Sequence, residues 1–189
     1  MVMAKKKLIA CQIFADELLA VLPEVYKDIE ITWLDPGLHM NMEKLETTIE
    51  QALKNAVAEG ADARVLFGNG CSPEMCNIIS RHGGKILGAK NCIDAFCHER
   101  VDELEQNRTV IMTPGWIRFF SNLMAEAGWD EVDVRQNWGR YDRILLLDTG
   151  VNPLSDEELL AFYDLIQVPI ETQPTGLDYF REKLMEVLG

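Results

Sequence analysis

ARVLFGNGCSPE, residues 63–74, carries the signals of a strand, a turn and a helix in that order. Its first half is a short apolar run typical of a buried strand, and Gly68 and Gly70 mark a turn directly after it. Ser72 has the residue type of a helix N-cap, and Pro73 suits the first helical position. A strand that turns tightly into a helix is part of a βαβ unit, so this stretch predicts an α/β protein.

The same alternation of strand and helix signals recurs along most of the chain. It predicts an open, mostly parallel sheet with helices on both faces, of the Rossmann or flavodoxin-like type. We expect one α/β domain over residues 1–189, with an irregular insertion at about 129–142. Further strands are expected at 8–14, 29–35, 85–89, 109–112, 143–148 and 168–172, and helices at about 16–26, 41–58, 72–82, 91–104, 114–127, 155–166 and 177–188.

Composition indicates an ordinary globular protein and restricts its partners. The 189 residues are 48% hydrophobic and 26% charged, and the formal net charge is −13. Such acidity argues against nucleic acid or an anionic membrane surface as a partner. Only LIA separates the N-terminal lysines from Cys11, too short an apolar core for a secretory signal, and no stretch has the length of a membrane-spanning helix. We therefore expect a cytoplasmic protein, in which five cysteines favour metal chemistry, redox chemistry or simple burial over disulfides.

Three cysteines share one topological position. Cys11, Cys71 and Cys92 each follow an expected strand, and His39 lies in the loop after the second strand. In a sheet of order 2-1-3-4-5, strands 1, 3 and 4 are neighbours about 4.8 Å apart, and their carboxyl ends form one edge. The four side chains would make a Cys₃His zinc site. Three cysteines with an open fourth position would equally suit an iron–sulfur cluster or a catalytic metal, so the metal stays undecided.

The same cysteines support a metal-free alternative. Cys71 directly precedes the expected N-cap Ser72, and Cys92 falls in the first turn of the helix expected at 91–104. Helix N-termini lower thiol pKa values, although a charge on Asp94 would oppose this. Either cysteine could therefore serve as the nucleophile of a thiol enzyme.

Four further residues are candidates for lining a ligand pocket at this edge. Gly68 and Gly70 would let the backbone approach a ligand closely. Trp116, in the TPGW turn at 113–116, would form a wall, and Asp148, which ends RILLLD, would supply a polar group. We predict a cofactor-binding or substrate-binding role for these four.

Three other residues of metal-binding type have no predicted role. Cys76 and Cys97 form C-x₄-C pairs with Cys71 and Cys92, a spacing less specific than the C-x₂-C of zinc ribbons. His98 follows Cys97 and would point elsewhere on the helix. The sequence leaves all three undecided.

The segments IAC, LH, FGNGC, NCI, TPGW and LLLDTG together resemble a family described only as a domain of unknown function, found in methanogens and other anaerobes. The resemblance extends from about Leu8 to beyond Gly150. Some relatives lie beside corrinoid-dependent methyl-transfer systems, which implies a link to anaerobic one-carbon metabolism. A zinc-like centre would then activate a thiolate acceptor, whereas an iron–sulfur cluster would suit electron transfer or corrinoid activation.

The implied partner is a small molecule or a corrinoid protein, and the sequence does not say whether the protein is an enzyme. A third interpretation is a non-catalytic protein that docks through the loop carrying Trp129 and Trp138. The oligomeric state is not predicted.

Overall fold

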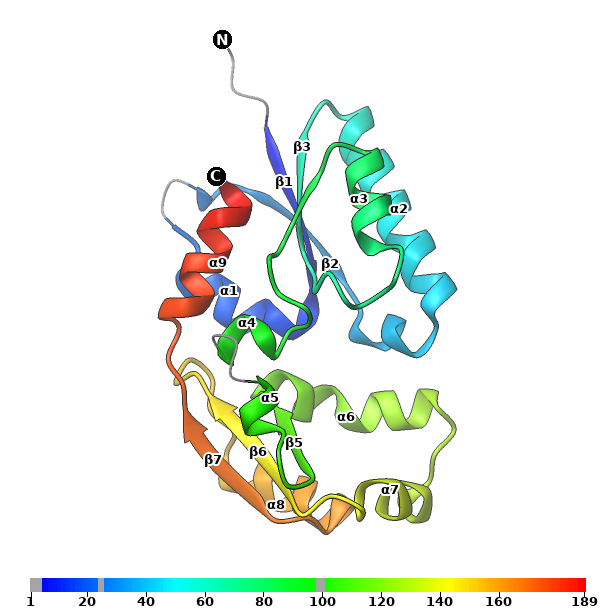
Figure 1. Ribbon diagram of the computed structural model, residues 1–189, viewed down its shortest axis with the longest axis vertical. Helices are drawn as coiled ribbons and strands as arrows, with labels where there is room; N and C mark the ends of the chain where they lie inside the picture. The colour runs from blue at the N-terminus through cyan, green and yellow to red at the C-terminus, as the bar shows by residue number, and fades with distance from the viewer. Residues whose placement is uncertain (1–4, 24–25, 98–100) are drawn as a thin grey trace.

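The computed structural model describes residues 5–23, 26–97 and 101–189. The described chain forms two parallel β-sheets with helices packed against them (Figure 1). The predicted α/β class with parallel strands is confirmed. The strands do not join into the one open sheet that the sequence suggested.

The first sheet has the order β2-β1-β3-β4, so the first four strands follow the predicted order. All three pairs of neighbours are parallel. β4 pairs with β3 over two residues only and is the last strand on that side of the sheet. The strands are β1 (Lys6–Cys11), β2 (Glu30–Leu34), β3 (Asp62–Leu66) and β4 (Lys85–Ile86).

The second sheet contains the remaining described strands in the order β5-β6-β7, again parallel. Its central strand carries the apolar run ILLL, which is buried throughout. The strands are β5 (Thr109–Met112), β6 (Arg143–Asp148) and β7 (Ile170–Pro174).

Helices cover both sheets. In Figure 1, α2 and α3 lie on one side of the first sheet and α1 and α9 on the other, while the chain returns from β7 to the first sheet through α9. We call the first sheet with α1 to α4 and α9 the first lobe, and the second sheet with α6 to α8 the second lobe. The helices are η1 (Gln12–Phe14), α1 (Ala15–Val21), η3 (Pro36–Met40), α2 (Met42–Ala58), α3 (Met75–Arg81), α4 (Asp94–Cys97), α5 (Val101–Leu104), α6 (Pro114–Glu126), α7 (Glu131–Trp138), α8 (Asp156–Ile166) and α9 (Asp178–Leu188).

A continuous hydrophobic core joins the two lobes. Leu145 and Leu147 of β6 belong to the same apolar cluster as the strands of the first sheet. Ile144 and Leu146, on the opposite face of β6, belong to a second cluster with Phe120 and Phe162. Because successive side chains of a strand point to opposite faces, β6 is buried on both sides and needs apolar residues at every position.

The segment from 129 to 142, predicted to be irregular, contains helix α7. Asp130 caps this helix and forms a capping box with Asp133. The Trp138 ring packs edge-on against Phe120 with 4.9 Å between ring centroids, so it belongs to the second apolar cluster. Trp138 is therefore not the exposed docking residue that the sequence suggested, whereas Trp129 is partly exposed.

The helix predicted from Ser72 begins later, at Met75, as α3. The Ser72 hydroxyl donates to the Glu46 carboxylate and accepts from the Glu74 amide, so it forms a turn before the helix. The helix predicted over 91–104 is seen as two short pieces, α4 and α5, and residues 98–100 between them lie outside the described residues.

Side chains just before α6 and α8 cap both helices. The Thr113 side chain accepts from the Trp116 amide, with Pro114 in the first helical turn. Ser155 and Glu158 form a capping box at the start of α8, the helix expected at 155–166. These local signals succeed because a cap depends on near neighbours in the sequence.

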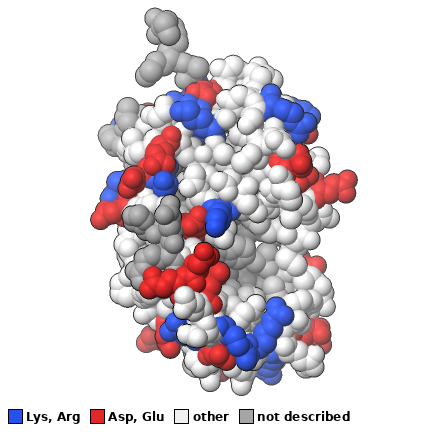
Figure 2. Space-filling view, in the orientation of Figure 1, with Lys and Arg blue, Asp and Glu red and all other residues white. Residues whose placement is uncertain are grey.

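Among the described residues, every helix is too short or too polar to cross a bilayer. On the face that Figure 2 shows, lysine and arginine side chains lie among acidic ones and form no broad basic area.

Candidate functional site

The three cysteines that follow strands of the first sheet lie close together. Cys11 ends β1, Cys71 follows β3 and Cys92 follows β4. Burial is the main cause of the raised pKa values of Cys11 and Cys92; a charge on Cys92 or Cys71 adds to the first, and a charge on Cys71 adds to the second. The three cysteines thus follow neighbouring strands at one edge of the first sheet, where a charge on one acts on another. Cys11 is buried, while the other two are half-buried.

Two loops bring Cys71 and Cys92 together by direct backbone contact. The Gly70 amide donates to the Lys90 carbonyl at 2.9 Å, and the Asn69 amide donates to the Ala89 carbonyl at 2.8 Å. A Cβ at Gly68 would overlap the Lys90 carbonyl oxygen and the Asn91 backbone. The sequence suggested that the backbone at these glycines approaches a ligand; here it approaches the neighbouring loop instead. Gly68 and Gly70 act by packing the two cysteine loops against each other.

The TPGW turn of the second lobe lies over this edge of the first sheet. Gly115 packs against η1, where an added Cβ would lie 2.8 Å from the Ile13 carbonyl oxygen. Trp116 Nε1 donates a hydrogen bond to Cys92 Sγ at 2.8 Å. A residue of the second lobe therefore contacts a cysteine of the first, and the site lies where the two lobes meet.

His39 lies on η3, after β2, and its ring contacts the same tryptophan. Its ring centroid is 6.1 Å from that of Trp116, in an edge-on arrangement, and 6.1 Å from that of Phe67, in a stacked one. His39 Nδ1 lies 3.0 Å from the Pro36 carbonyl oxygen, which can only accept. We therefore assign the proton of the neutral ring to Nδ1, which leaves the lone pair on Nε2.

Burial raises the pKa of all three thiols above the ordinary value for cysteine. Burial raises the pKa of Cys92 to about 12, although the Trp116 hydrogen bond acts in the opposite direction. Burial also raises the pKa of Cys71, and it holds that of Cys11 well above its usual range. The prediction that helix N-termini would lower these values is wrong, because α3 and α4 begin after the cysteines and desolvation dominates.

Other residues singled out in the sequence lie elsewhere. Asp148 ends β6 in the second sheet, and its carboxylate accepts from the Gly150 amide at 2.8 Å. Cys76 is exposed on α3, and Cys97 is buried in the first apolar cluster. His98 is outside the described residues.

The predicted Cys₃His metal site does not form in this arrangement. Within residues 5–23, 26–97 and 101–189, no group of three or more His, Cys, Asp or Glu side chains is placed to hold a metal ion. Cys92 Sγ is instead directed at the indole N–H of Trp116. The described side chains thus do not fit zinc or an iron–sulfur cluster, and we derive no step through a metal.

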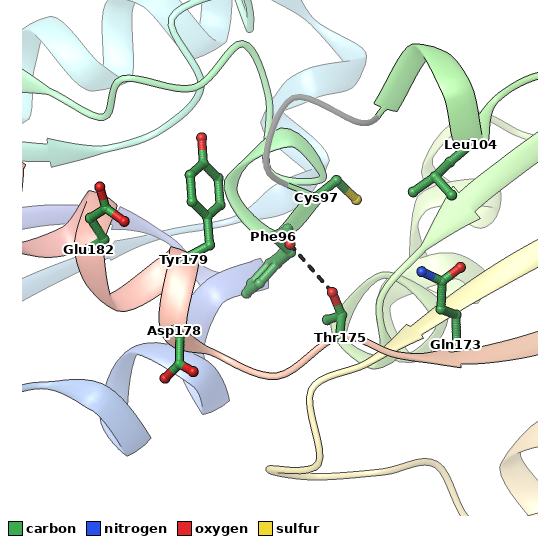
Figure 3. A pocket seen from close by; sticks show the side chains of 8 residues that line it. All are labelled: Phe96, Cys97, Leu104, Gln173, Thr175, Asp178, Tyr179 and Glu182. Atoms are coloured by element: carbon green, nitrogen blue, oxygen red, sulfur yellow. Dashed lines mark hydrogen bonds between the residues drawn. The ribbon is translucent and has the colours of Figure 1, made fainter.

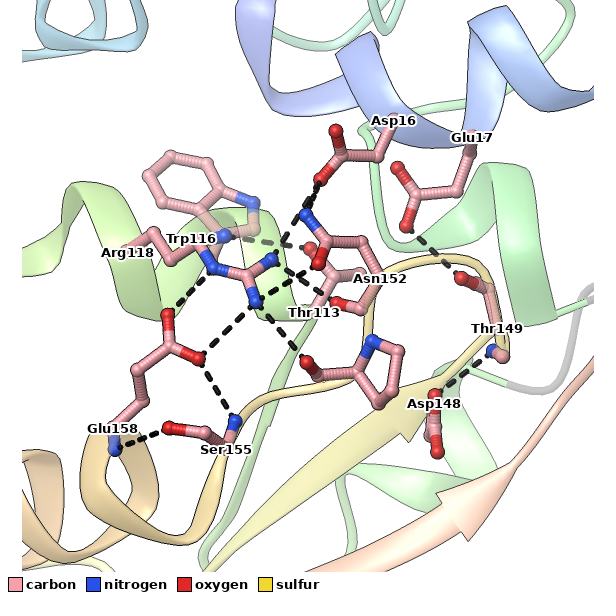
Figure 4. A network of polar contacts seen from close by, with 12 residues as sticks. Asp16, Glu17, Thr113, Trp116, Arg118, Asp148, Thr149, Asn152, Ser155 and Glu158 are labelled. Carbon is pink, nitrogen blue, oxygen red and sulfur yellow. Dashed lines mark hydrogen bonds and ion pairs between the residues drawn. The ribbon is translucent and has the colours of Figure 1, made fainter.

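A polar network between the lobes was missed in the sequence. Arg118 of α6 pairs with Glu158 at 2.7 Å in its own lobe and with Asp16 of α1 at 3.6 Å in the other (Figure 4). Thr149 Oγ1 donates to the buried carboxylate of Glu17 at 3.1 Å. The one available signal was a single arginine within the apolar first half of the helix at 114–127.

The cavity shown in Figure 3 lies beside the chain connections between the lobes. Its volume is about 690 Å³, and Thr175 Oγ1 donates to the Phe96 carbonyl at 3.4 Å on its wall. Leu104 and Gln173 line it near the two points where the chain passes between lobes. None of the three clustered cysteines lines this cavity.

Comparison with known proteins identifies a family and no reaction. The profile of a family described as "Protein of unknown function (DUF1638)" matches residues 33–184. No curated protein matches the chain. Among solved structures, one described as "Structure of unliganded arylmalonate decarboxylase" is 13% identical, with a TM-score of 0.30, over 97% of this chain and 90% of the other. A likeness of that extent carries no argument about activity.

Proposed function

Because the chain belongs to the DUF1638 family, whose description assigns no reaction, we propose a function from the geometry of the site. We propose that the protein performs metal-free thiol chemistry on a small electrophilic molecule, with Cys71 and Cys92 as reacting thiols. Sγ of one cysteine would add to the carbon of a polarised double bond. The S–C bond forms as the π bond breaks, its electron pair moves to the far atom, and the thiol proton passes through a base to that atom.

The hydrogen bond from Trp116 to Cys92 carries this proposal. The indole N–H is a donor only, so it favours negative charge on Cys92 Sγ. A fixed donor aimed at an atom where charge develops stabilises the transition state more than the resting thiol. The resting site can therefore stay protonated and still support a thiolate during reaction.

His39 supplies the base in this proposal. Its ring lies against the Trp116 indole, and the Pro36 carbonyl selects the tautomer whose Nε2 is free to accept a proton. Cys11, almost fully buried and with a strongly raised pKa, would act as a neutral neighbour that limits the charge the site can hold.

Competitive alkylation tests the proposal. Anaerobically purified protein is treated with iodoacetamide at mildly alkaline pH, with and without a chelator, and each cysteine is followed by peptide mass spectrometry. We expect iodoacetamide to modify either Cys71 or Cys92 in a given molecule, because modification of one prevents modification of the other. Cys11 should stay unmodified. The exposed Cys76 provides an internal reference. Independent modification of Cys71 and Cys92 would contradict a shared site.

Metal binding is the competing outcome of the same experiment. Three neighbouring sulfurs favour a thiophilic metal if their side chains rearrange, since metal binding releases thiol protons. Stoichiometric zinc or iron, with thiols that react only after chelation, would replace the metal-free proposal. The link to corrinoid-dependent methyl transfer stays a prediction, which copurification with a corrinoid protein would test.

A further inference from the structure

The network around Arg118 joins three segments that are far apart in the sequence (Figure 4). Arg118 Nε donates to Glu158 Oε1 at 2.7 Å, and Arg118 Nη1 donates to the Asn152 carbonyl at 3.0 Å. Asn152 Nδ2 in turn donates to Asp16 Oδ2 at 2.7 Å. The guanidinium thus ties the start of α6 to the loop before α8 and, through Asp16, to α1 of the first lobe.

A second contact holds the same two lobes together beside the first. Thr149 Oγ1 donates to Glu17 Oε1 at 3.1 Å, and both side chains are buried. Asp16 and Glu17 are consecutive in the first turn of α1, which follows η1 and Cys11. The network therefore begins at Asp16 and Glu17, five and six residues after Cys11 of the site.

Helix α6 carries this network and the site on different sides. Trp116 and Arg118 are two positions apart, which places them about 200° apart around the helix axis. Trp116 points to Cys92 on one side, and Arg118 is held by Asp16 and Glu158 on the other. Contacts on both sides oppose rolling of the helix about its axis, and a roll would move the indole N–H away from the sulfur.

We infer that Arg118 is a positioning residue for Cys92, acting through the orientation of α6 and the hydrogen bond from Trp116. The inference deepens the proposed function, but it concerns the ionisation of Cys92 and does not require that this thiol be catalytic. Removing the guanidinium releases one side of the helix, so the Trp116 donor spends less time on the sulfur. The Cys92 thiolate then loses part of its stabilisation.

The test is a double-mutant cycle between Arg118→Ala and Trp116→Phe. Below the pKa of the thiol, the alkylation rate of Cys92 is proportional to its thiolate fraction. We expect Trp116→Phe to slow that rate roughly tenfold, the effect of losing one hydrogen bond to a charged acceptor. Arg118→Ala should slow it roughly fivefold, since its ion pairs are part-exposed.

The double variant gives the decisive comparison. If Arg118 acts through Trp116, adding Arg118→Ala to Trp116→Phe changes the Cys92 rate no further. Additive effects, or a faster rate in Arg118→Ala, would overturn the inference, because accessibility or direct charge would then control the thiol.

Two controls separate positioning from loss of folding. Arg135→Ala removes an arginine that donates to the Asp164 and Leu165 carbonyls in the same lobe, and it should leave the Cys92 rate unchanged. The exposed Cys76 should react at the same rate in every variant. If Cys71 and Cys92 are alkylated independently, the shared site of the proposed function fails, but the Cys92 rate still reports the coupling between Trp116 and Arg118, so the two proposals fail separately.

Discussion

Replacing Gly68 by alanine tests whether packing between loops assembles the cysteine site. The added methyl group would overlap the Lys90 carbonyl oxygen and the Asn91 Cα, both of which are backbone atoms. Overpacking usually costs about 1–3 kcal/mol, and an overlap with backbone belongs at the upper end because no side chain can turn away. We therefore expect a loss of about 3 kcal/mol in the free energy of unfolding. For a chain of this size that lowers Tm by roughly 6–12 °C.

The assay is urea unfolding followed by circular dichroism, with Gly88→Ala as the matched control. At Gly88 an added Cβ would meet only Glu186 Oε2, at 3.7 Å, which is ordinary contact. That variant should change the free energy of unfolding by less than about 0.5 kcal/mol. Equal stability of the two variants would refute the reasoning, because only the Gly68 methyl meets the neighbouring loop.

Three further predictions concern charge, core and metal. Burial raises the pKa of the Glu17 carboxyl in the folded protein. The protonated carboxyl therefore contributes fully to the free energy of unfolding below its unfolded pKa of about 4.3, and this contribution is lost as the pH rises through the pKa of the folded protein. The free energy of unfolding of Glu17→Gln in urea should thus equal that of the wild type near pH 4 and exceed it at pH 7. The same difference between the two proteins at both pH values would contradict this. Phe120→Ala should cost about 3–5 kcal/mol in the same assay, since this buried ring contacts Phe162 and Trp138, and a loss below about 1 kcal/mol would mean that the second cluster contributes little. Tm should be the same after treatment with a chelator and after addition of zinc, and a large rise of Tm with zinc would favour the metal alternative.

The parts of the fold that the sequence predicted depend on short-range signals. The alternation of apolar runs with capped helices gave the class and the first four strands in order, and Cys11, Cys71 and Cys92 share one edge because parallel strands end together. The division into two sheets was not predicted. RILLLD indicates a strand buried on both faces, but it does not say whether its neighbours are strands of one sheet or of two.

The chemistry of the site was harder to predict than its position. Thiol pKa values depend on where α3 and α4 begin, and the Ser72 hydroxyl bonds to Glu46 instead of capping a helix. The contacts of Trp116 with Cys92 and His39 join residues 24 and 77 positions apart, and no local pattern encodes them. Arg118 was missed for the same reason, because its partners come from α1 and from the loop before α8.

The most direct measurement is the reaction of the purified protein with phenylarsine oxide, whose arsenic forms two bonds to paired thiols. Peptide mass spectrometry would show which cysteines the single arsenic atom joins. We predict one adduct per chain that links the peptides of Cys71 and Cys92, and its loss in Cys71→Ser or Cys92→Ser but not in Cys76→Ser. An unmodified protein, or an adduct that survives Cys71→Ser and Cys92→Ser together, would contradict the claim that these thiols form one site.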